Sequence, residues 1–432
     1  MTLPLSAQSG LTGERSGPGT SSNRLVSGVA LLTGGFDPHY TFGLATALAS
    51  KGVFVDVIGG DAVDSLYLHT TPNLKFLNLR GSKWEAGLAS KVWRVLVYYA
   101  RLVRYAAVAK PKIFHILWNN KFEFFDRTLL MLYYKLLGRK IVITAHNVNF
   151  GTMYSPNSWR SSRSDRAPFG WNDSLLNRLS LRVQYLLANR IFVHTEKMKH
   201  ELMRQFGVPQ GKVSLIPYGI NNSVPNTGLT PSQAKQGLGV GDDERVLLFF
   251  GRIRPYKGLE YLVGAFLQLA AAHRAYRLII AGQPLEETEK YWDQIQARID
   301  THRSRGQVIR RIQYIPDEET ELYFKAADVL VLPYTHIYQS GVLFLAYSFG
   351  LPVIASDVGS FRHDIIEGKT GYLCLPCDAA DLANTIETYF ESDLFKALDR
   401  RRLEIRDYAR ARHSWDLVGE MTRNVYAELV GR

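Results

Sequence analysis

Residues 25–36 read LVSGVALLTGGF, and this stretch decides the fold. An apolar run of strand length ends in a turn with two glycines, a helical pattern follows at 41–50, and a second apolar run spans 53–60. A strand, a glycine-rich turn, a helix and a second strand are typical of the opening of a parallel, doubly wound sheet. The sequence therefore predicts an α/β fold.

The same alternation continues and then starts again. Further strands are expected in the first half at 113–117, 141–144, 191–195 and 212–217. The second half repeats the pattern, with strands at 245–250, 277–281, 327–332 and 352–355 and a helix at 259–272. A chain of 432 residues is too long for one ordinary core. We predict two Rossmann-like domains that face each other across a cleft, where ligands of such sheets bind.

The predicted organisation has five parts. They are a tail at 1–23, a first domain at 24–220, a linker at 221–244, a second domain at 245–413 and a final helix at 414–432 that packs back on the first domain. The tail is rich in Ser, Gly, Thr and Pro and has no apolar core beside a basic region. We expect it to be disordered and not a signal peptide.

Positive charge is concentrated in the first half. Residues 1–225 hold 27 Lys and Arg against 12 Asp and Glu, a net charge of +15, whereas the remainder has a net charge of −3. Such asymmetry indicates that one half faces something acidic: nucleic acid, anionic lipid or a phosphorylated substrate. Basic and aromatic residues interleave in one helix only, and no recognition motif is present, so we expect no nucleic acid partner.

Cysteines and long apolar runs are both scarce. Cys374 and Cys377 form one Cys-Leu-Pro-Cys with no second pair for a structural zinc site, so we expect small core residues in a reducing cytosol. No stretch supplies the ~20 uninterrupted apolar residues of a membrane span. We expect a cytoplasmic protein, with a peripheral position on the cytoplasmic membrane face as the alternative.

The sharpest chemical signal is GRIRPYKG at 251–258, which follows a predicted strand and precedes a helix. A helix N-terminus offers unpaired N–H groups and a partial positive charge. Arg252 and Lys257 add a forked and a point-like cation to the same short loop, and Gly251 leaves room for a ligand at its start. Together these groups suit a diphosphate, although a solvated basic turn is the alternative.

A second glycine-marked segment precedes an apolar helix at 342–349. Ser340 is placed to cap that helix, and Gly341 lets a ligand approach the backbone. With Gln339 these are the residues of the segment that we assign to donor binding, because ordinary packing explains the rest.

Several short segments resemble family-4 glycosyltransferases, which are retaining enzymes of the GT-B fold. The Arg and Lys after a glycine-terminated strand match that family's diphosphate grip, and the resemblance covers about residues 29–429. The other segments that carry it, in order, are TAHN at 144–147, PYGI at 217–220, ADVLVLP at 327–333, GLPVIAS at 350–356 and EGKTGY at 367–372. Their combination is more specific than any single element.

The resemblance implies donor binding in the second domain and acceptor binding in the first. Gly34 and Gly35 would let donor and acceptor approach the backbone, with a plain tight turn as the alternative. His146 would contact the donor sugar from the end of a first-domain strand. At the positions of two glutamates that the family uses for the donor, this chain has Ile337 and Leu345, so donor recognition must differ.

The resulting hypothesis is a retaining glycosyltransferase that moves a sugar from a nucleoside-diphosphate sugar to a glycan or lipid-linked acceptor, in cell-surface polysaccharide or glycolipid synthesis. Charged groups on the leaving diphosphate make a metal unnecessary, so we expect no metal and no cofactor beyond the donor. Another GT-B activity on the same ligands, such as an epimerase or a phosphorylase, is one alternative. A binding protein that kept the fold and lost catalysis is the other.

Residues 91–110 read as one helix that bears on the acceptor. Four cations and two tyrosines fall on one arc of about 140°: Lys91, Arg94, Tyr98, Arg101, Arg104 and Tyr105. Such a face suits an anionic membrane surface, and a solvated outer face of the sheet is the equal alternative. The membrane interpretation favours a lipid-linked acceptor.

Overall fold

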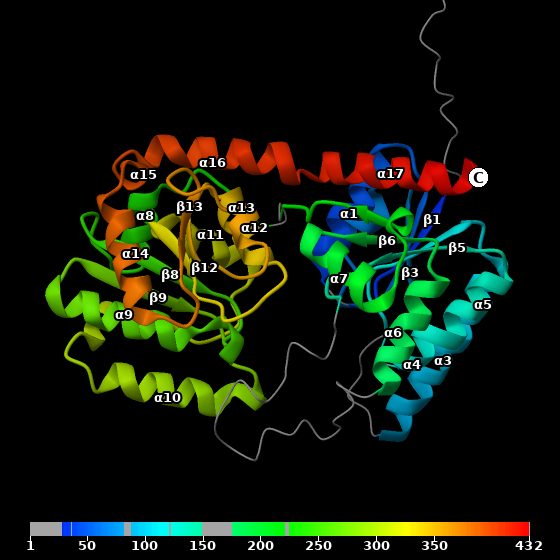
Figure 1. The fold of residues 1–432 in the computed structure, drawn as a ribbon, viewed down its shortest axis with the longest axis horizontal. Helices are drawn as coiled ribbons and strands as arrows, with labels where there is room; N and C mark the ends of the chain where they lie inside the picture. The colour runs from blue at the N-terminus through cyan, green and yellow to red at the C-terminus, as the bar shows by residue number, and fades with distance from the viewer. Residues whose placement is uncertain are drawn as a thin grey trace, which may run out of the picture.

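The computed structural model describes residues 28–35, 37–81, 88–120, 122–148, 175–220 and 224–431. Two α/β domains lie side by side, and two long helices run along one side of both (Figure 1). The predicted α/β fold with two Rossmann-like domains is confirmed. The expected tail at 1–23 lies outside the described residues.

The first domain is built on a seven-stranded parallel sheet of order β3-β2-β1-β4-β5-β6-β7. Its strands are β1 (Val29–Leu32), β2 (Val55–Gly59), β3 (Leu74–Asn78), β4 (Ile113–Ile116), β5 (Lys140–Thr144), β6 (Arg190–Val193) and β7 (Val213–Leu215). Apolar residues on both faces of the central strands are buried, as expected for a sheet covered by helices on each side.

Helices of the first domain form two layers. The helical segments of this domain are α1 (Pro38–Ser50), α2 (Leu66–Thr70), α3 (Leu88–Val108), α4 (Glu123–Phe125), a π-helical turn (Asp126–Leu130), α5 (Met131–Leu136), α6 (Leu175–Leu187) and α7 (Glu196–Phe206). One core joins α3, α5, α6 and α7 to one face of the sheet. A second core joins α1 and α2 to the other face.

The second domain has a six-stranded parallel sheet of order β10-β9-β8-β11-β12-β13. Its strands are β8 (Arg245–Phe250), β9 (Tyr276–Ala281), β10 (Val308–Arg311), β11 (Val329–Leu332), β12 (Val353–Ser356) and β13 (Gly371–Cys374). Its α-helices are α8 (Pro231–Gly237), α9 (Leu259–Ala272), α10 (Glu289–Asp300), α11 (Asp317–Ala326), α12 (Gly341–Ser348), α13 (Phe361–Asp364), α14 (Ala379–Glu391), α15 (Asp393–Lys396) and α16 (Leu398–His413). One large hydrophobic core fills both faces.

The expected linker at 221–244 is wrong in part. Residues 231–237 form α8, which begins with a capping box at Thr230 and packs on α11. Ala234, Leu238 and Val240 belong to the core of the second domain. The helix α8 was not predicted because this stretch is polar and rich in glycine, and because the apolar side of the helix is narrow. The three edge strands β3, β10 and β13 were also not predicted, because polar residues or a glycine keep each of them from forming a continuous apolar run of strand length.

The two cysteines differ in environment. Cys374 is buried at the end of β13, as expected for a core residue, whereas Cys377 is exposed. The expectation for Cys377 is therefore wrong. It lies in the turn before α14 with a φ of 61°, where the chain has already left the sheet.

The last helix, α17 (Trp415–Gly431), lies on the first domain and packs against α1. The Trp415 ring fits between Gly43 and Gly219, where an added Cβ would come within 2.0 Å and 2.5 Å of it. Lys51 forms an ion pair with Asp416 at 2.7 Å. Next to this point the backbone N–H of Ile220 donates to the carbonyl oxygen of His413, so the two chain crossings between the domains lie side by side.

Candidate active site

The loop after β8 is fixed by two glycines. Gly251 has a φ of 97° and Gly258 a φ of 64°, a region that favours glycine. An added Cβ on Gly258 would lie 2.0 Å from the carbonyl oxygen of Pro333, so the close packing there excludes any larger residue. Between them a short 3-10 turn, Pro255–Lys257, brings the lysine side chain back toward the start of the loop.

Lys257 is buried, with 6% of its surface exposed. Among the described residues its ammonium has no hydrogen bond and no carboxylate partner; it lies 5.9 Å from the centre of the Phe249 ring and 5.7 Å from that of Tyr334. Burial, and then the charges of Arg254 and Arg252, lower the pKa of Lys257 to about 7. A buried cation without a counterion is costly, so this site favours an anionic ligand.

The start of α12 lies beside this lysine. A Cβ built on Gly251 would be 3.0 Å from the Lys257 Nζ and 3.9 Å from the Val342 side chain in the first turn of α12. The positive end of the α12 dipole and the Lys257 ammonium therefore lie next to the same space. Arg252, on the same loop, is exposed and can reach out to a ligand.

Ser340 occupies the N-cap position of α12, but its side chain makes no capping hydrogen bond. The prediction that it caps the helix is therefore wrong, and the residue is buried at this position. Gly341 is the first helical residue, and Gln339 has a shielded Oε1 with no hydrogen-bond partner among the described residues. Their assignment to donor binding stays a prediction.

His146 lies at the carboxyl end of β5 in an aromatic cluster. Its ring stacks on Trp118 with centroids 4.3 Å apart and meets the Tyr40 edge at 4.8 Å. Its Nδ1 is 3.2 Å from the Nε2 of His194. Burial, and then the nearby His194 and His115, hold the pKa of His146 well below its usual value, so the ring is neutral at neutral pH.

Gly34 and Gly35 form the turn after β1, with φ values of 60° and 78°. A Cβ on Gly34 would lie 2.7 Å from the Asn119 carbonyl oxygen, and one on Gly35 would lie 2.6 Å from the Arg80 guanidinium. Tight packing and positive φ thus account for both glycines, which favours the plain turn. The same packing places the turn beside Trp118 and hence beside His146.

Tyr218 contacts residues of both domains. A Cβ on Gly341 would lie 3.5 Å from its hydroxyl, and its ring stacks on Phe344 of α12 with centroids 5.7 Å apart. The same tyrosine lies 6.3 Å from the His146 ring and donates a hydrogen bond to Asp37. The loop at 251–258, the start of α12 and His146 therefore lie near one another, with Tyr218 between the last two.

A second contact across the cleft joins Tyr338 to Glu201 of α7, with the phenol donating at 2.5 Å. Sequence reasoning missed this pair, and it missed Arg80, Trp118, His194 and Tyr218. Trp118, His194 and Tyr218 lie at the ends of predicted strands, but Arg80 follows β3, which was not predicted, and nothing in the sequence indicates which strand ends meet.

The two residues at the family's glutamate positions have apolar surroundings. Leu345 is buried in the hydrophobic core of the second domain, and Ile337 is partly buried against that core. Whether they redirect donor choice stays a prediction.

The basic face expected on α3 is partly wrong. Tyr98 is buried and its hydroxyl donates to Asn120, while Tyr105 is partly buried and donates to Asp56. Both tyrosines pack toward the sheet because they share a side with Leu102 and Ala106, so they cannot face a membrane. The Lys91 side chain lies outside the described residues.

Within the described ranges, none of the helices combines the length and apolarity needed to cross a bilayer. The described side chains also include no cluster of three His, Cys, Asp or Glu residues that could hold a metal ion.

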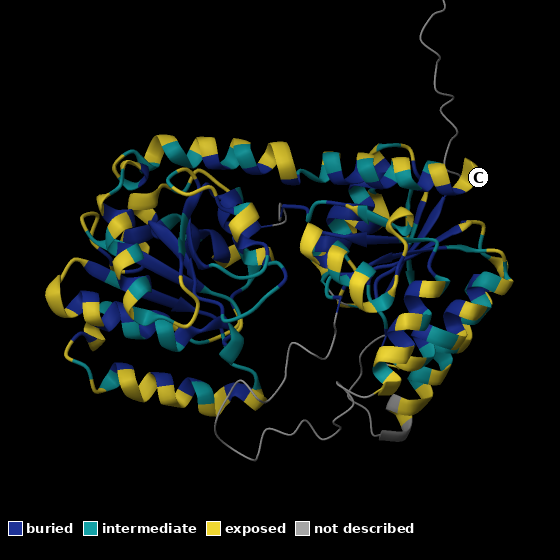
Figure 2. Ribbon diagram, viewed as in Figure 1, coloured by how far each residue is buried: buried dark blue, intermediate teal, exposed yellow. Residues whose placement is uncertain are grey.

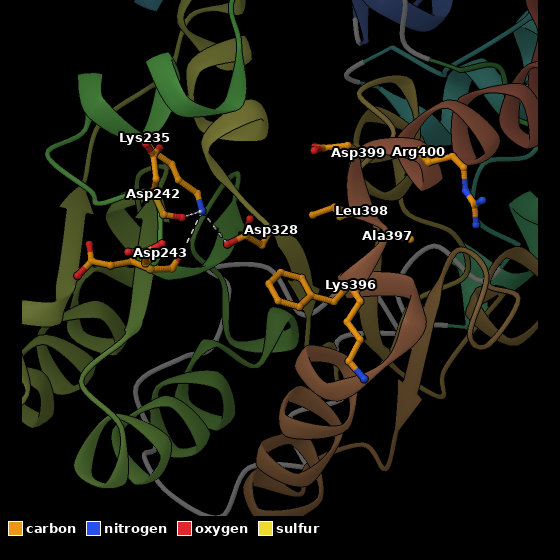
Figure 3. Close-up of a pocket in the computed structure, with 11 residues that line it drawn as sticks. Lys235, Asp242, Asp243, Asp328, Lys396, Ala397, Leu398, Asp399 and Arg400 are labelled. Carbon is orange, nitrogen blue, oxygen red and sulfur yellow. Dashed lines mark hydrogen bonds and ion pairs between the residues drawn. The ribbon is translucent and has the colours of Figure 1, made fainter.

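A hollow of about 490 Å³ lies elsewhere, between α8, the turn before β8 and the start of α16 (Figure 3). It opens at the amino ends of β8 and β11, opposite the edge where ligands of such sheets bind. Its buried Lys235 and Asp328 pair with each other at 3.2 Å, so they hold the fold together and offer no free charge.

Two family models match successive parts of the chain. The model described as Glycosyltransferase Family 4 matches residues 39–224, and the model described as Glycosyl transferases group 1 matches residues 232–412. Among curated proteins, D-inositol 3-phosphate glycosyltransferase of Corynebacterium efficiens is 23% identical over 406 residues, which cover 90% of this chain and 89% of that protein. The chain spans between 52% and 62% of the length of several other curated relatives that it matches.

Solved structures show the same fold. Sucrose-phosphate synthase from Thermosynechococcus elongatus has a TM-score of 0.71 at 22% identity, covering 94% of this chain and 99% of that one. HepE from Anabaena, solved in complex with UDP, has a TM-score of 0.69 at 17% identity, covering 93% and 100%. With both halves of the chain matched by glycosyltransferase models and the whole by this fold, the protein is a GT-B glycosyltransferase similar to family 4.

Proposed function

We propose that the protein transfers a sugar from a nucleoside-diphosphate sugar, with retention at the anomeric carbon, to a glycan or lipid-linked acceptor in cell-surface polysaccharide or glycolipid synthesis. The observation that supports this most is Lys257, a buried ammonium beside the start of α12 that has no counterion in the described part of the chain. A diphosphate would supply the missing charge. HepE, which shares the fold, is described with UDP and with UDP-glucose.

The chemical difficulty of such a transfer is the charge that develops when the glycosidic bond to the diphosphate breaks. Lys257, Arg252 and the N-terminus of α12 would stabilise the leaving diphosphate more as its charge grows, which accelerates the step. In a same-face reaction the leaving phosphate can take the proton of the acceptor hydroxyl, so no separate base is required. His146, neutral and at the opposite side of the cleft, would orient the donor sugar.

The test begins with the donor. Wild-type protein is screened by thermal shift against nucleoside diphosphates and their sugars, because a ligand that binds only the folded state raises apparent stability. Turnover of the best donor is then compared in wild type, Lys257→Ala and Arg252→Ala, with circular dichroism to show that each variant is folded. Unchanged turnover in both variants would overturn the diphosphate assignment.

Two outcomes separate the competing functions. Release of a nucleoside diphosphate together with a glycosylated product supports a transferase and excludes an epimerase. Tight donor binding without turnover, in the presence of a broad acceptor panel, supports a binding protein, which the apolar residues at 337 and 345 would explain.

The first domain supports a lipid-linked acceptor. The outer side of the layer formed by α3, α5 and α6 is exposed at many positions (Figure 2), and large apolar residues lie among them: Val92, Trp93, Leu96, Leu132, Leu136, Leu175, Leu176, Leu179 and Leu186. Neither α3 nor α6 contains an acidic residue, and both carry arginines. An apolar and basic surface of this kind suits the headgroup region of an anionic membrane.

Vesicle co-sedimentation tests this part. Binding to vesicles with anionic lipid at low salt, weakened by salt and by Trp93→Ser with Leu96→Ser, would support a membrane-bound acceptor. The matched control is Leu66→Ser, an exposed leucine of α2 on the other side of the sheet. Equal indifference to anionic and neutral vesicles at low salt would remove the membrane from the proposal and leave the donor chemistry intact.

A further inference from the structure

His194 lies directly beside His146 and has no part in the reaction described above. It follows β6, and its ring centroid is 5.1 Å from that of His146. It is buried, and the same cluster of rings surrounds it, with Tyr40 at 5.8 Å and Tyr218 at 5.2 Å. The two histidines thus form a contiguous buried pair.

The backbone fixes the proton on His194. Its Nδ1 lies 2.9 Å from the carbonyl oxygen of Ile216. A carbonyl oxygen only accepts, so Nδ1 must carry the hydrogen. Burial lowers the pKa of His194 to about 4, so the ring is neutral at neutral pH and its Nε2 is a bare lone pair.

That lone pair fixes the proton on His146. The Nε2 of His194 lies 3.2 Å from the Nδ1 of His146, and a bare nitrogen there requires a hydrogen on Nδ1. His146 is itself neutral, so its own Nε2 must be bare. This atom is shielded from solvent and has no hydrogen-bond partner among the described residues.

We propose that His194 is a positioning residue which, held by the Ile216 carbonyl, keeps His146 in the Nδ1–H tautomer and leaves its Nε2 as a hydrogen-bond acceptor for a sugar hydroxyl. A shielded, unsatisfied acceptor costs free energy, and a hydroxyl that reaches it recovers that cost. With the other tautomer, the hydroxyl would meet an N–H group and would have to turn its own oxygen toward it. The role in sugar binding rests on the proposed function, whereas the tautomer does not.

Nitrogen-15 NMR of the full-length protein tests the tautomer without any substrate. Long-range correlation spectra are recorded with uniformly labelled protein, and the His146 ring is assigned by its loss in His146→Gln. We expect wild-type His146 to show a protonated Nδ1 and an unprotonated Nε2. In His194→Phe, which keeps a ring but removes the acceptor, the Nε2–H form should become populated. A wild-type His146 protonated at Nε2, or one unchanged in His194→Phe, would overturn the proposal.

Kinetics then separate positioning from packing. We expect His194→Phe to lower kcat/KM for the sugar donor about tenfold, the value of roughly one hydrogen bond, while affinity for the free nucleoside diphosphate stays the same. His194→Gln, whose amide oxygen can accept from Nδ1, should recover most of the loss. Equal loss in both variants would indicate packing alone.

The proposed function can fail independently. If no nucleotide sugar is turned over but the spectra show the expected tautomers, the donor chemistry is wrong and the histidine pair stands.

Discussion

The second domain buries two lysines at opposite edges of one sheet, and their surroundings differ. Lys235, at the amino ends of the strands, donates to the carbonyl oxygens of Asp242 and Glu244 and pairs with Asp328 at 3.2 Å (Figure 3). Lys257, at the carboxyl ends, has aromatic rings near it and no anion among the described residues.

A buried lysine can thus either stabilise the fold or remain available for a ligand. A buried charge is tolerated when the protein supplies its counterion and its hydrogen bonds. Lys235 meets that condition within its own domain. Lys257 does not, and its lowered pKa expresses the cost, which an anionic ligand would offset. The comparison therefore predicts opposite responses to the same substitution.

The largest effect is expected from Lys235→Met. Loss of the ammonium leaves Asp328 buried and unpaired, which should lower the free energy of unfolding by about 3–5 kcal/mol. Urea denaturation measures it. A second variant that also carries Asp328→Asn should regain much of the stability because no charge is left buried. Turnover by the folded fraction should be unchanged, and a specific loss of turnover would show that this edge of the sheet also serves catalysis.

Lys257→Met should give the reverse pattern. Turnover should fall ~100- to 1,000-fold, or about 2.7–4 kcal/mol of transition-state stabilisation, by analogy with an oxyanion-hole donor. Stability should stay the same or rise, because an uncompensated charge is replaced by an apolar chain of similar length. Steady-state kinetics and urea denaturation on the same preparation measure both. A strongly destabilised variant would mean that Lys257 supports the fold after all.

The sequence pattern indicates the role of Lys257 but not the role of Lys235. Lys257 lies in a glycine-bounded strand-to-helix loop, where pattern and helix chemistry together point to an anion. Lys235 lies in a polar stretch that predicts a linker, and its partner Asp328 is 93 residues away. Only the packing of α8 on α11 brings them together, and no local pattern encodes that contact.

The same limit explains the rest of the molecule. Central strands were predictable because burial on both faces requires continuous apolar runs, whereas β3, β10 and β13 were not. His146 could be placed at a strand end, but its contact with His194 depends on the neighbouring positions of β5 and β6 in the sheet. The helical periodicity predicts that Tyr98 and Tyr105 share one side of the helix with the cations. It does not predict that this side packs toward the sheet.

Arg252→Ala should have a smaller effect than Lys257→Met. The side chain is exposed, and under the proposed function it would supply a charge-assisted hydrogen bond, so its loss should cost roughly 1.5–3 kcal/mol in transition-state stabilisation. Affinity for the nucleoside diphosphate should fall with it, as titration calorimetry would show. An effect as large as that of Lys257→Met would mean that burial does not distinguish the two cations.

Proton linkage gives a further difference between wild type and Lys257→Met. Because the pKa of Lys257 is about 7 in the folded protein and ~10.4 when unfolded, the unfolded state binds more protons between these values and wild-type stability should rise with pH there. Under the proposed function the diphosphate of UDP would prefer the protonated amine, so UDP affinity should fall roughly tenfold from pH 7 to pH 8.5. Lys257→Met should show neither slope, and calorimetry at both pH values measures the second.

The smallest effect, and the most selective, is expected from Arg254→Ala. Arg254 lies 4.0 Å from Glu287 in a partly exposed pair, so its loss should change stability by ~0–1 kcal/mol. Of the two arginine charges that lower the pKa of Lys257, that of Arg254 has the larger effect. Removing it should raise that pKa, so Lys257 would stay protonated to higher pH and UDP should bind more tightly at pH 8.5 than it does to wild type.

Arg252→Ala and Arg254→Ala are therefore expected to change UDP affinity in opposite directions. Arg252→Ala also removes a charge near Lys257, but it loses a direct contact and should weaken UDP binding at every pH. Arg254→Ala should not weaken UDP binding at any pH. It should strengthen UDP binding only in the pH range in which wild-type Lys257 has lost its proton. Weaker binding by Arg254→Ala at pH 6, where Lys257 is charged in both proteins, would instead place Arg254 on the diphosphate and make the loop a three-cation grip.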